Sequence, residues 1–532
     1  MMKRFLMEHG AELLLSLHAC LFSTPHYKTI GTLMAAGGLL LASTRGRSPR
    51  VLLLLLPLIL GAIASLVYGT ALGPSLEACG ILAGAYGWYL AGTGPSPGRG
   101  LISSACAIIL SVLSCGEWLL TREAPRLWMV SPIDCGIAIL LQGIFGFRAQ
   151  IIRYRRLFHF SSLGTVLAVI ASTSRALGIA AAAALFLLIP GRRRLKIALV
   201  ALFLLAALPS VISRVRSDPL AWHRSSIYLA TSSLIMERPW TGWGLGSFDA
   251  VSRRALLPDP LEIRRMRSPV YAHNDFLELA MEIGLPLACA ALAAWLFLIL
   301  ATATAGYRTE AAFLVAVSLL SLFYFPLRLV YPLFHAFHAA GSAFPLSPAP
   351  ARSRFPLVEF SMAGLLMLYA LGLQTRSHEL APYDARIAIE SRSPTAVDDF
   401  LKLESERPEA WVAAAMRSSR SGSPDDAIRG FESAVGKSPT ESPIRFELAR
   451  AWLWKAEQAE RNSDTMTATE ARRRLSHQLG FIRTVEPLQL AAIENTGDTL
   501  EFSLANIALE RLERDGEPAA NVRFMRRRMD LR

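Results

Sequence analysis

The stretch VLLLLLPLILGAIASLVY, residues 51–68, runs for eighteen residues without a charged side chain. A helix needs about 20 apolar residues to cross the hydrocarbon core of a bilayer. A second stretch, 195–212, has the same character apart from Lys196. Of the 532 residues, 52% are hydrophobic and only 18% are charged, which is unlike a soluble protein of this size. We therefore predict an all-α, polytopic transmembrane helix bundle.

The chain divides into two regions of different character. Apolar blocks fill residues 9–373, whereas 374–532 are polar and charged. We predict a membrane domain over 1–373 and a soluble helical domain over 374–532. The membrane domain is expected to contain thirteen spans, near 9–23, 27–43, 51–68, 76–92, 101–119, 130–146, 157–173, 176–190, 195–212, 273–303, 309–325, 329–346 and 356–373.

Arginine clusters indicate the orientation of these spans. Four clusters follow even-numbered spans, and Lys and Arg accumulate on cytoplasmic loops. Thirteen spans with a cytoplasmic N-terminus place all four clusters inside; Arg122 and Arg126, after span five, are a small exception. The same count places the 213–272 loop and the tail outside the cytoplasm. Topology explains most of the net charge of +13, and basic clusters between spans do not suit nucleic acid binding.

The predicted extracytoplasmic loop, 213–272, is rich in arginine. It holds nine arginines against five acids, a net charge of +4, and no lysine. A long loop can be translocated regardless of its charge, so topology alone is one explanation. Recognition of an anion is the other, because the planar guanidinium matches phosphate oxygens in a bidentate way.

The tail contains a repeat-like pattern. Trp411, Ala427, Phe431, Ala434 and Pro439 stand at the spacing of a tetratricopeptide unit, whose period is about 34 residues. The next unit decays, so a plain helical hairpin is the alternative. Either helical module is expected to hold a protein partner or acceptor, or to brace the membrane domain.

Three polar stretches carry the candidate chemistry. They are STSRALG (172–178), HRSSIYLATSSLIMERPWTGWGLGSF (223–248) and YAHNDFLELAMEIGLP (271–286). Together they resemble the O-antigen ligase/polymerase family, which includes lipopolysaccharide O-antigen ligases, related polymerases and bacterial protein O-oligosaccharyltransferases. The positions that carry the resemblance are Ser174, Arg175, Arg224, Pro239, Gly242, Gly244, Gly246, His273, Asn274, Glu278, Glu282 and Gly284.

The resemblance implies a GT-C-like bundle in a bacterial inner membrane and a donor in which a polyprenyl pyrophosphate carries the saccharide. It implies that His273 is the base that takes the proton of the acceptor hydroxyl. A neutral imidazole can do this near neutral pH, although an interfacial histidine is the plain alternative. Arg175 and Arg224 are the candidate pyrophosphate ligands, with Arg328 a weaker third; otherwise they are arginines that snorkel toward lipid phosphates.

Asn274, Glu278 and Glu282 follow one another at intervals of four, so a helix places them on one stripe. Carboxylates at membrane depth usually face the bundle interior or a wet cavity. We expect the stripe to bind sugar hydroxyls or to fix the tautomer of His273; a polar packing seam is the alternative.

Other side chains near the motifs give weaker indications of function. Trp243, with Trp240 and Tyr271, is a candidate platform for sugar rings, although interfacial aromatics are common. The glycines of 242–246 lack the strand and GK[ST] of a nucleotide-binding loop and are expected to shape a tight turn. Six scattered cysteines support neither a disulfide framework nor a zinc site. We expect no metal and no cofactor.

The leading hypothesis is an inverting, metal-independent transfer of a saccharide to an acceptor hydroxyl at the outer face of the membrane. A lipid A-core sugar or a protein hydroxyl as acceptor makes the protein a ligase, and a second lipid-linked glycan makes it a polymerase. The rival is a transporter of lipid-linked saccharides that does no chemistry. Such a transporter often shows an internal repeat of spans, which this sequence lacks, and needs no base at position 273.

Overall fold

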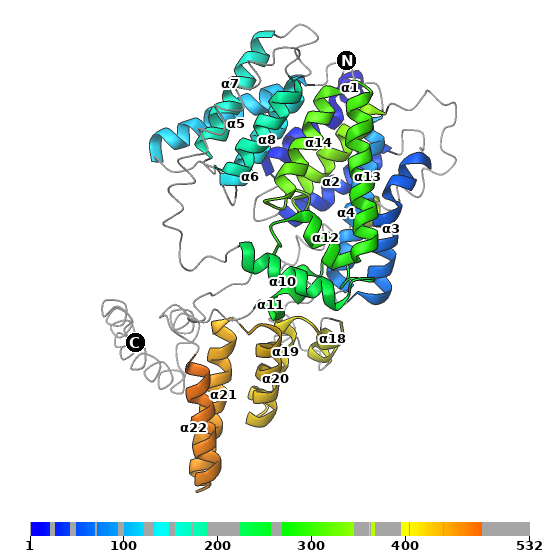
Figure 1. Ribbon diagram of the computed structural model, residues 1–532. Helices are drawn as coiled ribbons and strands as arrows, with labels where there is room; N and C mark the ends of the chain where they lie inside the picture. Colours follow the sequence, from blue (N-terminus) through cyan, green and yellow to red (C-terminus); the bar gives the residue numbers. More distant parts are fainter. Residues whose placement is uncertain are drawn as a thin grey trace. The chain divides into compact units, whose positions relative to one another are not determined.

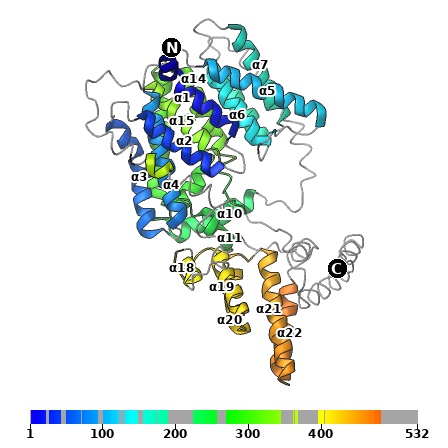
Figure 2. The same cartoon turned by 180° about the vertical axis from the view of Figure 1, so that it is seen from behind.

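The computed structural model describes a helical protein (Figures 1 and 2). It describes residues 2–21, 27–42, 49–69, 72–93, 100–121, 127, 129, 132–147, 155–172, 174–188, 224–256, 269–344, 361, 363–367, 395–403, 405–439 and 441–480. These residues form helices joined by turns, with no strand among them. They fall into two compact units, which are described one at a time.

The first unit comprises residues 1–64, 76–217 and 272–378. Its described helices are α1 (Met2–Leu21), α2 (Tyr27–Ala42), most of α3 (Pro49–Tyr68), most of α4 (Leu72–Gly92), α5 (Leu101–Thr121), α6 (Pro132–Gly146), α7 (Arg155–Ala171), α8 (Arg175–Leu188), α12 (Asp275–Ile283), α13 (Leu285–Thr304), α14 (Arg308–Ser321) and α15 (Val330–Ala343). They lie at eleven of the thirteen predicted spans. The expected span at 195–212 and most of that at 356–373 lie outside the described residues, so the count of thirteen stays a prediction.

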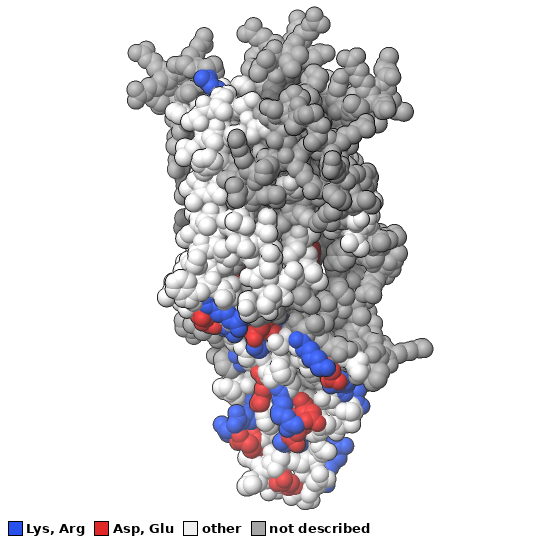
Figure 3. Space-filling view, turned by 90° about the vertical axis from the view of Figure 1, so that its right-hand side faces the viewer, with Lys and Arg blue, Asp and Glu red and all other residues white. Residues whose placement is uncertain are grey.

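The outer surface of this unit is apolar where it is described. Side chains such as Val112 and Leu120 of α5 and Phe297 and Leu300 of α13 are exposed. On the face in Figure 3, the described charged side chains gather on the second unit and the first is almost uncharged. Among the described helices, α5 and α13 are long and apolar enough to cross a membrane, and four shorter apolar segments accompany them. A large exposed apolar surface is unfavourable in water and suits a lipid environment.

Small residues let the helices of this unit approach closely. A Cβ built on Gly84 of α4 would lie 2.4 Å from the Cβ of Ala35 on α2, and one on Gly341 of α15 would lie 1.9 Å from the carbonyl oxygen of Tyr89. Lipid chains are as apolar as leucine, so packing of this kind, rather than hydrophobic burial, holds membrane helices together.

The predicted tenth span, 273–303, is interrupted. Gly284 takes a φ of +82° between α12 and α13, and Pro286 stands in the first turn of α13. Glycine adopts this left-handed conformation without steric cost, and proline at a helix start removes no hydrogen bond. The span is therefore a nine-residue helix followed by a twenty-residue helix.

The second unit comprises residues 65–75, 218–271 and 379–532. It contains α10 (Arg224–Glu237), α11 (Phe248–Ala255), α18 (Ala396–Leu403), α19 (Pro408–Arg420), α20 (Pro424–Lys437), α21 (Ser442–Arg461) and α22 (Thr465–Leu479). The predicted extracytoplasmic loop and the predicted tail thus share one compact unit. The division into 1–373 and 374–532 stays a prediction.

The tail forms two helical hairpins, α19–α20 and α21–α22. Ala427, Phe431 and Ala434 of α20 are fully buried, as the repeat pattern requires. The first helices of the hairpins begin at Pro408 and Ser442, 34 residues apart, which agrees with the period of tetratricopeptide units. The helix α21 is longer than α19, so the second hairpin departs from the pattern. The tetratricopeptide assignment stays a prediction.

Two glycines of α20 predict opposite effects of the same substitution. A Cβ on Gly430 would meet the Cβ of Ala415 on α19 at 2.8 Å, whereas a Cβ on Gly436 would meet nothing within 4 Å. We expect Gly430→Ala to destabilise the protein by about 1–3 kcal/mol through overpacking. Gly436→Ala should stabilise it by about 0.5–1 kcal/mol, because alanine favours helix. Thermal unfolding of the two purified variants tests this, and equal shifts would contradict the close α19–α20 contact.

Candidate functional site

The short helix α12 begins at a well-defined cap. The side-chain oxygen of Asn274 accepts hydrogen bonds from the backbone N–H groups of Phe276 and Leu277, at 3.1 and 3.0 Å. Its amide nitrogen donates to the carbonyl of Leu322 at 3.4 Å. Asparagine is among the preferred residues at this position because it satisfies helix N–H groups that lack a partner in the helix. Asn274 therefore fixes the backbone at the start of α12. This capping role explains an asparagine at position 274 without the predicted contact with sugar.

His273 precedes this cap in an unusual conformation. Its φ is +55°, in the left-handed region that residues other than glycine rarely adopt. The conformation costs about 1–2 kcal/mol for a side chain with a Cβ. The imidazole lies beside the rings of Phe325 and Tyr324, with centroids 5.2 and 6.2 Å away. The hydroxyl of Tyr324 donates to Asp134 on α6 at 2.9 Å. Strain of this kind clusters at functional sites, where the surrounding structure maintains it.

The carboxylates of α12 converge on one arginine. The Nε of Arg328 lies 3.1 Å from Oε1 of Glu278, and its Nη2 lies 2.5 Å from Oε2 of Glu282. Both carboxylates are buried. The second oxygen of Glu278 accepts from the backbone N–H of Ala272 at 2.8 Å. The prediction that Glu278 and Glu282 lie on one stripe agrees with these contacts, because both reach the same guanidinium.

Asp275 ties the same helix to the segment that carries Arg328. Its Oδ2 accepts from the backbone N–H of Leu327 at 2.9 Å, and the aspartate is buried. Four side chains, Asp275, Glu278, Glu282 and Arg328, thus join α12 to the 322–329 turn. We call them the carboxylate–arginine cluster. It holds the two rings that contact His273, at 324 and 325, next to the start of α12.

This cluster changes the interpretation of two predicted site residues. Arg328 was expected to be a weaker pyrophosphate ligand, but its guanidinium is engaged by two buried carboxylates. Both oxygens of Glu278 are engaged as well, with Arg328 and the N–H of Ala272, rather than with the ring of His273. Arg328 and Glu278 are therefore better explained as residues that position the start of α12.

The two stronger arginine candidates lie in different units. Arg175 begins α8 in the first unit, the unit of His273, and its side chain is exposed. Arg224 begins α10 in the second unit, where its charge acts on Tyr228 one turn further along. Burial raises the pKa of Tyr228, and the charge of Arg224 opposes that rise. The convergence of residues 175, 224 and 273 in one pocket stays a prediction.

Trp243 does not suit the predicted role of a sugar platform. Its side chain is only 3% exposed, and its indole N–H donates to the carbonyl of Leu234 at 2.9 Å. The guanidinium carbons of Arg238 and Arg254 lie 3.9 and 4.2 Å from its ring centroid. Cation–π contacts of this kind already use the aromatic face. Trp240, at 78% exposed, is the better candidate for contact with a sugar.

The glycine-rich turn between α10 and α11 is held by the connection between α3 and α4. Gly242, Gly244 and Gly246 all take a positive φ. Within the second unit, the backbone N–H of Leu245 donates to Oγ of Ser65 at 2.8 Å, and Oγ of Ser75 donates to the carbonyl of Leu245 at 2.9 Å. The expected tight turn is present. No group of three His, Cys, Asp or Glu in the described part of the chain is arranged to hold a metal ion.

The apolar helices and the buried cluster of charges fit a helical membrane protein. Residues 160–292 match the family model of O-antigen ligases. Over this segment, which is a quarter of the chain, the protein is similar to O-antigen ligases. The match contains every predicted site residue except Arg328 and ends before the tail. No curated protein matches the chain.

Proposed function

We propose that the protein transfers a saccharide from a polyprenyl pyrophosphate carrier to an acceptor hydroxyl at the outer face of a bacterial inner membrane. His273 acts as the general base, Arg175 and Arg224 hold the pyrophosphate, and no metal takes part. The observation that carries the proposal is the strained His273 at the start of α12, inside the family match and next to the carboxylate–arginine cluster.

The reaction is a direct displacement. The acceptor oxygen forms a bond to the anomeric carbon as its proton passes to the imidazole of His273. The bond between that carbon and the pyrophosphate oxygen breaks, and the polyprenyl pyrophosphate leaves with the electron pair. Attack opposite the leaving group inverts the anomeric configuration. Fixed guanidinium groups stabilise the charge that develops on the leaving group, and the imidazolium then returns its proton to water.

The acceptor decides between ligase and polymerase activity. A sugar of a lipid A-core or a protein hydroxyl would make the protein a ligase, and a second lipid-linked saccharide would make it a polymerase. The conformation of His273 supports an enzyme over a transporter, because a transporter gains nothing from a strained backbone that holds an imidazole beside two aromatic rings. The outward orientation of the second unit, including its tail, is part of this proposal.

Membranes that contain the protein, supplied with a polyprenyl-pyrophosphate-linked saccharide, test the proposal. We expect a glycan-bearing acceptor and free polyprenyl pyrophosphate in equal amounts, with the anomeric configuration inverted in the product. A chelator of divalent metals should leave the rate unchanged. Transport of the donor across vesicles without any transfer product would contradict the proposal.

Replacing Arg224 by lysine tests the role of the fork-shaped guanidinium. Lysine keeps the charge but loses bidentate binding, and a charge-assisted hydrogen bond contributes about 1.5–3 kcal/mol. We therefore expect transfer to fall by about tenfold or more. Arg429→Lys, at an exposed ion pair within the tail, is the matched control and should keep full activity. Full activity of Arg224→Lys would show that bidentate binding at this position is not needed.

A further inference from the structure

Two adjacent arginines of α11 reach across the second unit to the tail. The Nη1 of Arg253 lies 2.5 Å from Glu409 and 3.3 Å from Glu441, and its Nη2 lies 2.8 Å from Asp249. The Nη1 of Arg254 lies 3.4 Å from Oε2 of Glu406. We call Arg253 and Arg254, together with Glu406, Glu409 and Glu441, the loop–tail clamp. The helix α11 also packs against α20.

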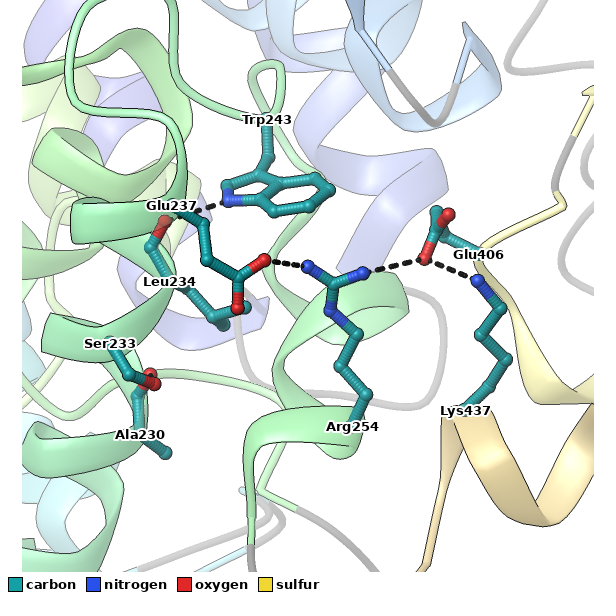
Figure 4. Close-up of polar contacts among 8 residues, drawn as sticks. All are labelled: Ala230, Ser233, Leu234, Glu237, Trp243, Arg254, Glu406 and Lys437. Atoms are coloured by element: carbon teal, nitrogen blue, oxygen red, sulfur yellow. Dashed lines mark hydrogen bonds and ion pairs between the residues drawn. The ribbon is translucent and has the colours of Figure 1, made fainter.

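Arg254 connects this clamp to the glycine-rich turn. Figure 4 shows its guanidinium between Glu237, at the end of α10, and Glu406, which also accepts from the amine of Lys437 at 2.8 Å. The same guanidinium carbon lies 4.2 Å from the ring centroid of Trp243. One side chain therefore contacts α10, the turn at 242–246 and the tail.

The arrangement of charges favours this contact over a chance surface pairing. Arg253 and Arg254 lie in the last turn of α11, where cations stabilise the helix end. Glu409 lies in the first turn of α19 and Glu441 caps α21, where anions are favoured. Arg253 is only 13% exposed. Burial alone would lower its pKa, but the carboxylates of Glu409, Asp249 and Glu441 together raise it.

The contacts within the loop lead from the clamp toward Arg224. The helix α10 begins at Arg224 and ends at Glu237, which pairs with Arg254. Trp243 packs under Arg254 and Arg238 and is bonded to Leu234 of the same helix. A displacement of about 1 Å at a catalytic group can cost on the order of 10²-fold in rate. A clamp that holds the C-terminal end of α10 and the turn after it can therefore influence the position of the first residue of α10, at the other end of the same rigid helix.

We propose that the tail is a positioning element of the transfer reaction, which it serves by holding α10 and the glycine-rich turn through the loop–tail clamp. The inference rests on the proposed function, since it assigns Arg224 the role of a pyrophosphate ligand. It also explains two of the nine loop arginines without phosphate: their guanidinium groups bind carboxylates of the tail. The clamp residues are positioning residues and not catalytic ones.

A charge exchange across the clamp tests the inference in the full chain. Arg253→Glu and Glu409→Arg should each lower kcat for transfer by about tenfold to a hundredfold, with a smaller change in the KM for the lipid-linked donor. The double variant restores opposite charges at 253 and 409, although a glutamate at 253 still faces Asp249 and Glu441, so it should recover part of the lost rate. Arg417→Glu, which breaks the exposed pair with Asp398 inside the tail, is the matched control and should keep wild-type kinetics.

Limited proteolysis separates a loss of position from a loss of the folded tail. The single variants should release the tail faster than the wild type, and the double variant should restore its protection. Wild-type kcat in both single variants would overturn the inference while leaving the proposed function intact, as would a loss in Arg417→Glu as large as that in Arg253→Glu. If neither the wild type nor any variant transfers glycan, the proposed function fails. Protection of the tail from protease then still shows whether the clamp joins the loop to the tail.

Discussion

Replacing His273 by asparagine is expected to lower glycan transfer by about 10²–10⁴-fold, the usual contribution of a general base. Asparagine tolerates the left-handed backbone that position 273 requires, with a φ of +55°. Its amide cannot accept the proton of an attacking hydroxyl. The variant should therefore fold normally and lose only the proton acceptor. The rate of glycan transfer from a lipid-linked donor in membranes measures this loss directly.

His273→Gly provides the stability control for this prediction. Glycine removes the strain of a positive φ, so the variant should unfold at the same temperature as the wild type or higher. Its transfer rate should be as low as that of His273→Asn. Turnover near the wild-type rate in either well-expressed variant would mean that the imidazole takes no proton, and the enzymatic proposal would lose its base.

Replacing Arg328 by alanine is expected to destabilise the first unit by about 3–5 kcal/mol. The substitution leaves two buried carboxylates, Glu278 and Glu282, without the guanidinium that both of them contact. Removal of one partner from a buried ion pair costs far more than the pair contributes, because the remaining charge is neither solvated nor paired. Thermal unfolding of the purified protein in detergent is the measurement.

A triple variant distinguishes this explanation from a simple loss of packing. Arg328→Met combined with Glu278→Leu and Glu282→Leu removes these three charges and keeps most of the volume, so part of the lost stability should return although the buried Asp275 stays in place. If Arg328→Ala unfolds at the wild-type temperature, the cluster is hydrated and does not hold the 322–329 turn against α12.

The helices follow closely from the sequence because their apolar stretches are long and their boundaries are marked. Predicted spans at 51–68 and 101–119 coincide with α3 and α5 to within two residues. The interruption at Gly284 also has a local cause in the glycine and Pro286. The shared face of Glu278 and Glu282 follows from helical periodicity alone, whereas Asn274, predicted on the same stripe, caps α12 instead.

The partners of these side chains do not follow from local pattern. Arg328 lies 46 residues after Glu282, and no periodicity links them. The arginines of the loop were ambiguous for a different reason. A guanidinium presents the same fork to a phosphate and to a carboxylate, so the type of residue could not tell a pyrophosphate site from the ion pairs that Arg253 and Arg254 make with the tail. The carboxylates at 406, 409 and 441 show that Arg253 and Arg254 form ion pairs, and they lie more than 150 positions away in the sequence.

The break at Gly284 bears on how far from the bilayer centre the proposed reaction takes place. The twenty residues of α13 are about 30 Å long, enough to cross the hydrocarbon core without help. The nine residues of α12 then add up to about 13 Å beyond the acyl chains. In the proposed orientation, α12 would carry His273 out of the acyl chains to the headgroup layer or just beyond it, where an acceptor from the aqueous side can reach the imidazole.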